Sequence, residues 1–184
     1  MGMSVGWSLS KDPRYPIGKF VRPMSVSPEE RAELLDVLAA TPSLLRGAVT
    51  GLSDDQLDTP YRLGGWTVRQ VVHHMADSHM NSYIRCRLAL TEDAPLIKPY
   101  EQAKWAELAD ARTLFVEPSL ALLENLHARW VALLRSLNPE DFARTFRHPE
   151  YADPMSLDAN LALYAWHGMH HTTHITGLRQ RMGW

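Results

Sequence analysis

Histidines are concentrated in one stretch near the end of the chain, where YAWHGMHHTTHITGL places four of the nine histidines within eight positions. Imidazole binds divalent metals and also exchanges protons near neutral pH. Residues four apart on a helix lie on one face, so His167 and His171 can direct two ring nitrogens at one point. The stretch is therefore either half of a metal site or a hydrogen-bonded polar layer inside the protein.

The helix expected over about 156–180 directs most of these histidines toward the protein interior. Its apolar residues recur at i, i+3, i+4 and i+7, and His167, His171 and His174 fall on the same stripe. His170 lies about 60° from that stripe, so it is a poorer ligand and a better pocket residue. Buried imidazoles need partners, because an unpaired buried polar group costs about 1–3 kcal/mol.

A third metal ligand has to come from another helix, and VVHHMADSHMN on the second expected helix offers candidates. Periodicity does not choose among them: His79 lies at the centre of the apolar face, with His73 and His74 on opposite flanks. A single histidine on an apolar face is more often a core residue than a ligand, which applies to His79 and His127. Two inward-facing imidazole groups on separate helices nonetheless favour a metal site.

Four long helices are expected to position these side chains. Ser27 with Glu30, and Thr67 with Gln70, match the capping box that starts a helix. Long amphipathic segments occupy about 27–49, 67–90, 118–137 and 156–180. Pro42 predicts a kink in the first. Four such segments without a convincing strand pattern predict an all-α four-helix bundle.

The remaining segments connect or precede these helices. Residues 1–26 contain three prolines and read as an extended N-terminal arm, which leaves 27–184 as one bundle domain. The connection 91–117 contains only a short helical piece, and connections of this length are often functional. Residues 142–154 are irregular and could include a short hairpin.

Composition indicates an ordinary globular protein of 184 residues, with 45 % hydrophobic and 22 % charged residues and a net charge of −2. No basic block suggests binding to nucleic acid or to a membrane surface, and no apolar run suggests a signal peptide or a membrane span. Cys86, the single cysteine, suits a reducing compartment and reads as a buried hydrophobic residue. We therefore expect a cytoplasmic protein that acts on a small molecule.

Three segments together, RYPIGKF, GGWTVRQVVHHMADSHMNSYIR and YAWHGMHHTTHI, resemble the YfiT-like branch of the DinB superfamily. The resemblance extends from about Arg14 to Trp184. It implies an up-down-down-up bundle that holds a divalent metal through three histidines. The family pattern W-[ST]-x(6)-H-x-x-[DE] makes His74, not His73, the ligand from the second helix. The last-helix pattern adds His167 and His171.

The resemblance also implies an enzyme. Three neutral imidazoles leave a coordination position open for water or a thiol, with zinc or nickel as the expected ion. Members of the branch are described as metal-dependent hydrolases, whereas some relatives transfer low-molecular-weight thiols such as bacillithiol. Asp77, His170 and His174 are expected to support the ligands. A homodimer is also expected from the superfamily, and the alternative function is a non-catalytic, stress-related binding protein.

Overall fold

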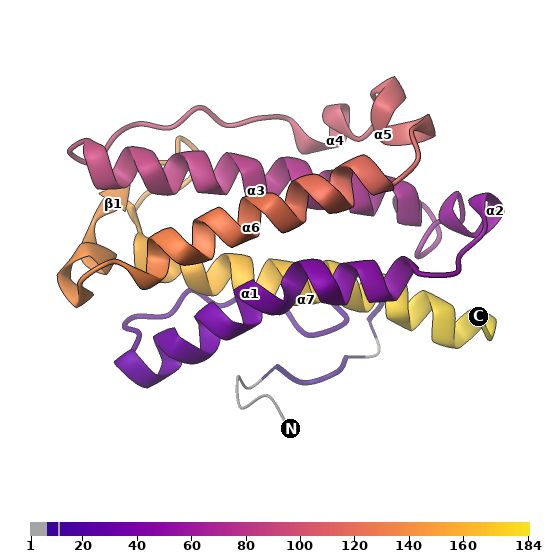
Figure 1. The fold of residues 1–184 in the computed structure, drawn as a ribbon, viewed down its shortest axis with the longest axis horizontal. Helices are drawn as coiled ribbons and strands as arrows, with labels where there is room; N and C mark the ends of the chain where they lie inside the picture. Colours follow the sequence, from indigo (N-terminus) through magenta and orange to yellow (C-terminus); the bar gives the residue numbers. More distant parts are fainter. Residues whose placement is uncertain (1–6, 11) are drawn as a thin grey trace.

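The computed structural model describes residues 7–10 and 12–184, and four long helices dominate it. They are α1 (Pro28–Val49), α3 (Val68–Thr91), α6 (Glu117–Arg135) and α7 (Leu157–Met182). The four-helix bundle expected from the sequence is confirmed (Figure 1). In the described part of the chain, no helix has the length and apolar character that crossing a membrane requires.

The order of the helices in space follows from one long crossover connection. α1 and α7 run in one direction, whereas α3 and α6 run in the opposite direction (Figure 1). α1 packs against α6 and α7, and α3 packs against the same two helices. The connection between α3 and α6 carries the short helices α4 (Gln102–Trp105) and α5 (Ala109–Thr113) along α3. This return path gives the up-down-down-up course.

Local capping fixes where the long helices begin. Both capping boxes expected from the sequence are present, at Ser27 before α1 and at Thr67 before α3. The Ser156 hydroxyl accepts from the third backbone amide of α7, so that helix also begins where expected. One further short helix, α2 (Asp54–Leu57), was not expected from the sequence; Ser53 caps it with a third capping box.

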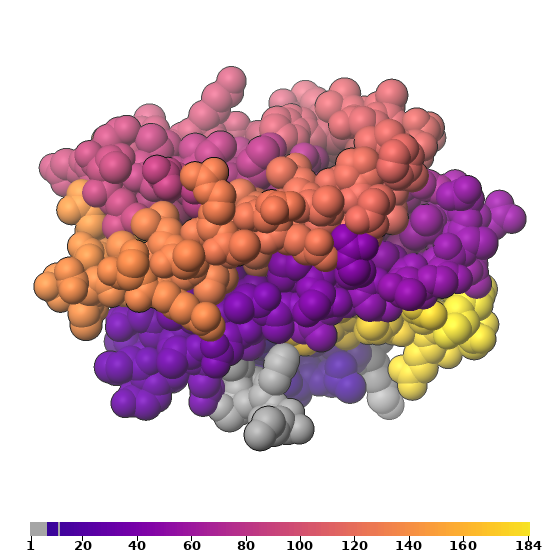
Figure 2. Space-filling model, viewed as in Figure 1, coloured from indigo at the N-terminus to yellow at the C-terminus, as the bar shows by residue number. Residues whose placement is uncertain are grey.

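Short elements close the end of the bundle where α6 leads into α7. They are the 3-10 helix η1 (Pro139–Ala143) and the strands β1 (Thr145–Phe146) and β2 (Met155–Ser156). The strands pair antiparallel, with Thr145 opposite Ser156 and Phe146 opposite Met155. The hairpin expected in this region is therefore present, and β2 continues directly into α7. In Figure 2, the end formed by η1, β1 and β2 (orange) and the connection between α3 and α6 (pink) lie on the surface beside α6 and α1.

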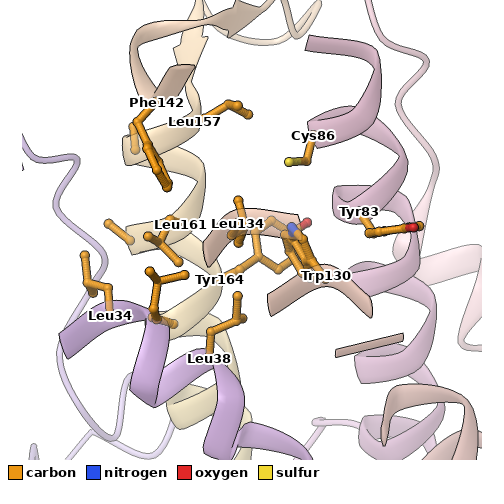
Figure 3. Packing of buried hydrophobic residues seen from close by; sticks show 14 of the residues in the cluster. Leu34, Leu38, Tyr83, Cys86, Trp130, Leu134, Phe142, Leu157, Leu161 and Tyr164 are labelled. Carbon is orange, nitrogen blue, oxygen red and sulfur yellow. The ribbon is translucent and has the colours of Figure 1, made fainter. Parts of the chain in front are cut away.

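The apolar core divides into two clusters along the bundle. One cluster is centred on Trp130, which packs near Tyr83 and Tyr164 (Figure 3). The other includes Val71 and Ile175 near the opposite end. Each long helix contributes to both clusters. Between the clusters each helix carries buried polar or histidine side chains: Thr41 on α1, His79 on α3, His127 on α6, and His170, His171 and His174, with the half-buried His167, on α7. We call this interval the polar layer.

The described part of the N-terminal arm lies against α7. Ile17 is buried, and the rings of Phe20 and Trp166 lie 5.8 Å apart. The backbone carbonyl of Arg14 lies 3.4 Å from Nε2 of His174. The arm therefore covers the histidine-bearing part of α7.

Candidate metal centre

Three imidazoles meet where α3 faces α7. The ligand atoms that His74, His167 and His171 can offer all lie within 4.8 Å of one another. Nε2 of His74 and Nε2 of His167 are 3.2 Å apart. Two nitrogens bound to one tetrahedral zinc ion at its usual bond length are about 3.3 Å apart. The spacing of this pair therefore fits a shared metal ion.

Local structure explains how the three rings come together. His167 and His171 lie one helical turn apart on α7, and their ring centroids are 4.5 Å apart. The capping box at Thr67 fixes the first turn of α3, and the ring of Trp66 lies 4.8 Å from the ring of His74. Among the described residues, this donor group contains no carboxylate.

Burial keeps these ligand candidates neutral at neutral pH. Burial, together with the nearby His170, lowers the pKa of His74 to about 4. The pKa values of His167 and His171 also lie well below their usual range, first because of burial and then because of the neighbouring imidazoles. A neutral imidazole has a free nitrogen lone pair, which is the form that binds a metal.

Two cavities open onto this cluster. One, of about 410 Å³, is lined by all three rings together with Arg62, Trp66 and Gln102. The other, of about 460 Å³, is lined by Tyr100, Asn160 and Tyr164 among others. His167 and Gln102 line both cavities. A small molecule can therefore approach all three rings from the first cavity and His167 from the second.

His170 and His174 lie beside the cluster and form a second close group with His171. His170 stacks on Trp166 with ring centroids 4.4 Å apart, and its Nδ1 is buried without a partner among the described residues. His174 stacks on Tyr61 at 4.0 Å, and its Nδ1 lies 3.4 Å from Nδ1 of His171. Both residues are placed to support His171 or contact a ligand.

Asp77 and His73 lie on either side of His74 in the sequence but are less involved in the cluster. Within the described structure, no hydrogen bond joins the Asp77 carboxyl to His74. Burial raises the pKa of Asp77 to about 6, and Asp110 adds to this effect. The two ring nitrogens of His73 are occupied by the Ser119 hydroxyl at 2.7 Å and the Leu114 carbonyl at 3.1 Å.

Two further histidines, which the sequence predicts as core residues, lie next to the cluster inside the bundle: His79 contacts the cluster, and His127 contacts His79. Nε2 of His79 lies 3.1 Å from Nδ1 of His167, and Nδ1 of His79 lies 2.8 Å from Nε2 of His127. The relative exposures of His79 and His127 are 0 % and 2 %, so the core assignment is correct. The contact of His79 with His167 was not expected. One sequence signal could have revealed it. Each long helix carries a polar or histidine residue on its inward face at a similar position along the bundle axis.

Comparison with known proteins identifies the family of the chain. A model of the DinB superfamily matches residues 37–175. The "Putative metal-dependent hydrolase YfiT" of Bacillus subtilis (strain 168) is 53 % identical over 170 residues, which cover 92 % of this chain and 96 % of the relative. The "Putative metal-dependent hydrolase BcerKBAB4_2443" of Bacillus mycoides (strain KBAB4) is 54 % identical over 174 residues, or 95 % of this chain and 99 % of the relative.

Solved structures are similar over most of the chain. YfiT from Bacillus subtilis, described as having an unusual four-helix bundle topology, aligns with a TM-score of 0.91 at 52 % identity and covers 94 % of this chain and 98 % of its own. The four-helix bundle protein TT2238 aligns with a TM-score of 0.58 at 23 % identity, over 80 % of this chain and 98 % of its own, and shares the fold. The chain belongs to the DinB superfamily.

Proposed function

We propose that this protein is a metal-dependent hydrolase in which His74, His167 and His171 hold one divalent ion. The single observation that carries the proposal is the convergence of three neutral imidazoles at a spacing that fits one ion, beside open cavities. The names of the relatives support the same reaction class. Three ligands leave a coordination position for a reactant, whereas structural zinc sites usually have four protein ligands.

The donor set limits the choice of ion. Imidazole suits zinc and nickel, and we propose one of these two. When bound, such an ion supplies Lewis acidity and lowers the pKa of a coordinated water or thiol. The unpartnered Nδ1 of His170 is available for a hydrogen bond to a reactant in the cavity that His170 lines. Trp66 and Trp166 shield the rings from bulk water.

Each cavity also contains a guanidinium that can bind an anionic group. Arg62 lines the cavity of about 410 Å³, and Arg85 lines the cavity of about 460 Å³. Among the described residues neither forms an ion pair, whereas Arg69 pairs with Asp54 and Asp58. Guanidinium groups bind carboxylates and phosphates in bidentate geometry. We propose that the substrate carries at least one carboxylate or phosphate group.

These arginines also favour a second candidate function, the transfer of a low-molecular-weight thiol that carries carboxylates. The metal would lower the thiol pKa, and Arg62 or Arg85 would bind the carboxylates. Cys86 takes no part in this chemistry, because it is fully buried and burial raises its pKa to about 11. The thiol would therefore be a co-substrate.

Metal content and turnover test the proposal together. The parent, His171→Ala and a matched buried variant, His73→Ala, are compared for bound zinc and nickel by mass spectrometry. We expect about one equivalent in the parent and in His73→Ala, and none in His171→Ala. Ester and amide substrates with an anionic group are then assayed with and without metal, and bacillithiol with an electrophile is assayed in parallel. If the protein binds metal but turns over none of these substrates, the proposal of an enzyme is wrong and the protein is a metal-binding protein.

A further inference from the structure

A continuous chain of hydrogen bonds runs from the candidate metal centre into the core. Nδ1 of His167 contacts Nε2 of His79 at 3.1 Å, and Nδ1 of His79 contacts Nε2 of His127 at 2.8 Å. Nδ1 of His127 then contacts the backbone carbonyl of Leu38 at 2.7 Å. We call these three rings and the carbonyl the histidine chain. It crosses the polar layer from α7 through α3 and α6 to α1.

The carbonyl at the end of the histidine chain is available because of a proline. In an α-helix the carbonyl of residue 38 would accept from the backbone N–H of residue 42. Residue 42 is Pro42, which lies inside α1 and has no N–H. The helix therefore leaves this buried acceptor without its usual donor, and the ring of His127 supplies one. His127 thus supplies the hydrogen bond that Pro42 cannot donate.

The direction of every hydrogen bond in the histidine chain follows from this end. A carbonyl oxygen only accepts, so Nδ1 of His127 carries its proton. In a neutral ring the other nitrogen is then an acceptor, so Nδ1 of His79 donates to Nε2 of His127. By the same step, Nδ1 of His167 donates to Nε2 of His79. Nε2 of His167 is left as an acceptor, and in the metal-free protein it accepts from Nε2 of His74.

We propose that His79 and His127 are positioning residues that hold His167 in the Nδ1–H tautomer and so present its Nε2 lone pair to the metal. The role assigned to that lone pair rests on the proposed function. The tautomers themselves rest only on the hydrogen bonds, which exist without metal. Partners that orient a ligating imidazole are usually a carboxylate, a carbonyl or water. Here two further imidazoles transmit the orientation from a carbonyl.

The surroundings of the histidine chain keep it in one state. The side chains of His79 and His127 are almost fully excluded from solvent. The ring of Tyr164 packs edge-on against His79 at 5.0 Å, and the ring of Trp130 packs edge-on against His127 at 5.9 Å. Burial lowers the pKa of His127 to about 4, so this ring is neutral at neutral pH. The 2.8 Å contact between Nδ1 of His79 and Nε2 of His127 requires one of these two nitrogens to be an acceptor, as the assignment of donors states.

The first test needs neither metal nor a variant. Long-range ¹H–¹⁵N spectra of the ¹⁵N-labelled, metal-free protein at neutral pH report which ring nitrogen of each histidine is protonated. We expect Nδ1–H at His167, His79 and His127. We expect Nε2–H at His74, because Nε2 of His167 can only accept from it. An Nε2–H tautomer at His127 or His167 would overturn the proposal even if the protein never binds a metal.

The second test separates positioning from simple packing. His127→Leu removes both hydrogen bonds, whereas His127→Gln retains a donor for Leu38 and an acceptor for His79. His73→Leu is the matched control, since it also removes a buried ring with two hydrogen bonds. Zinc affinity is measured by competition with a chelator, and the spectra are repeated on each variant.

We expect zinc binding to weaken about 10–100-fold in His127→Leu, as when ligand-orienting partners are removed elsewhere. His127→Gln should recover most of that affinity and retain Nδ1–H at His167. His73→Leu should bind zinc as the parent does. Equal losses in His127→Leu and His127→Gln, or an equal loss in His73→Leu, would show that the histidine chain acts only through packing. If His127→Leu does not fold, the Gln variant and the parent spectra still decide the tautomers.

Discussion

Two imidazole groups inside the bundle differ in what their nitrogens contact: the ligand group of His74, His167 and His171, and the core pair of His79 and His127. In the ligand group, Nε2 of His74 and Nε2 of His167 point at each other across 3.2 Å beside a cavity. In the core pair, each nitrogen of His79 and His127 has a fixed partner, and the last one is a carbonyl. Both groups are largely buried, with His167 half-buried, and both have lowered pKa values. Burial alone therefore does not distinguish a ligand from a structural histidine.

What distinguishes them is whether the protein already uses the nitrogen lone pairs. The core pair has none left, so it can only orient and stabilise. In the ligand group, the Nε2 lone pair of His167 contacts only the ring of His74, at the edge of a cavity, and a metal ion can replace that contact. Substitutions in the two groups should consequently separate metal binding from stability.

The largest effect is expected for the ligand group. His74→Ala should lower zinc affinity by more than the about 10–100-fold expected for loss of an orienting partner, because a direct bond to the ion is lost. The metal-free protein should lose less stability than it does in His127→Ala, since the ring of His74 borders a cavity that water can enter. Chelator competition and urea unfolding measure the two quantities. A variant that binds zinc as tightly as the parent would remove His74 from the site.

The opposite pattern is expected for the core pair. His127→Ala should destabilise the metal-free protein by about 2–5 kcal/mol, since it leaves a cavity and removes the donor to the Leu38 carbonyl. Urea unfolding in the presence of a chelator measures this loss. If His74→Ala and His127→Ala lost equal stability, the distinction between the two groups would be incorrect.

Acid should destabilise the metal-free protein through both groups. A histidine whose folded pKa is depressed binds fewer protons in the folded state than in the unfolded state. Its contribution to stability is complete above the unfolded value of 6.5 and is lost as the pH falls toward about 4, the folded pKa of His127. Each tenfold change in an acid dissociation constant on folding corresponds to about 1.4 kcal/mol. Urea midpoints that stay constant from neutral to acidic pH would contradict this account.

A smaller loss is expected where α1 approaches α7 beside His167. A Cβ added to Gly168 would lie 2.6 Å from the side chain of Thr41, which is fully buried. Gly168→Ala should therefore destabilise by about 1–3 kcal/mol through overpacking. Gly177→Ala on the same helix is the control, because a Cβ added there would meet only the end of the Arg181 side chain, at 3.4 Å. That variant should be neutral or stabilising in thermal melts.

The smallest effect concerns Asp77, whose carboxyl has a pKa raised from 3.8 to about 6. This group binds more protons in the folded state, so its contribution to stability is present below about 4 and is lost as the pH rises through 6. Asp77→Asn should therefore stabilise the protein at neutral pH, by about 1 kcal/mol or less because the side chain is only partly buried. Thermal melts measure this gain. Zinc affinity should not change, and a clear decrease would give Asp77 a role in orienting a ligand.

The long helices of the bundle could be predicted from local sequence signals. The capping residues Ser27, Thr67 and Ser156 start α1, α3 and α7 where they were expected to. These signals act between residues three or four apart, so the sequence contains them directly. The pairing of His167 with His171 has the same origin. α2 was missed because it is a single turn with too few residues to show a periodic pattern.

Only the tertiary structure decided how the remaining histidines are used. Helical periodicity placed His73 and His74 on opposite flanks of α3, and the flank that α7 occupies determines which of them meets His167. The link from His167 through His79 and His127 to Leu38 joins four helices. Hydrogen bonds are directional and short, so such a link depends on the relative positions of the packed helices. No spacing within one helix specifies those positions.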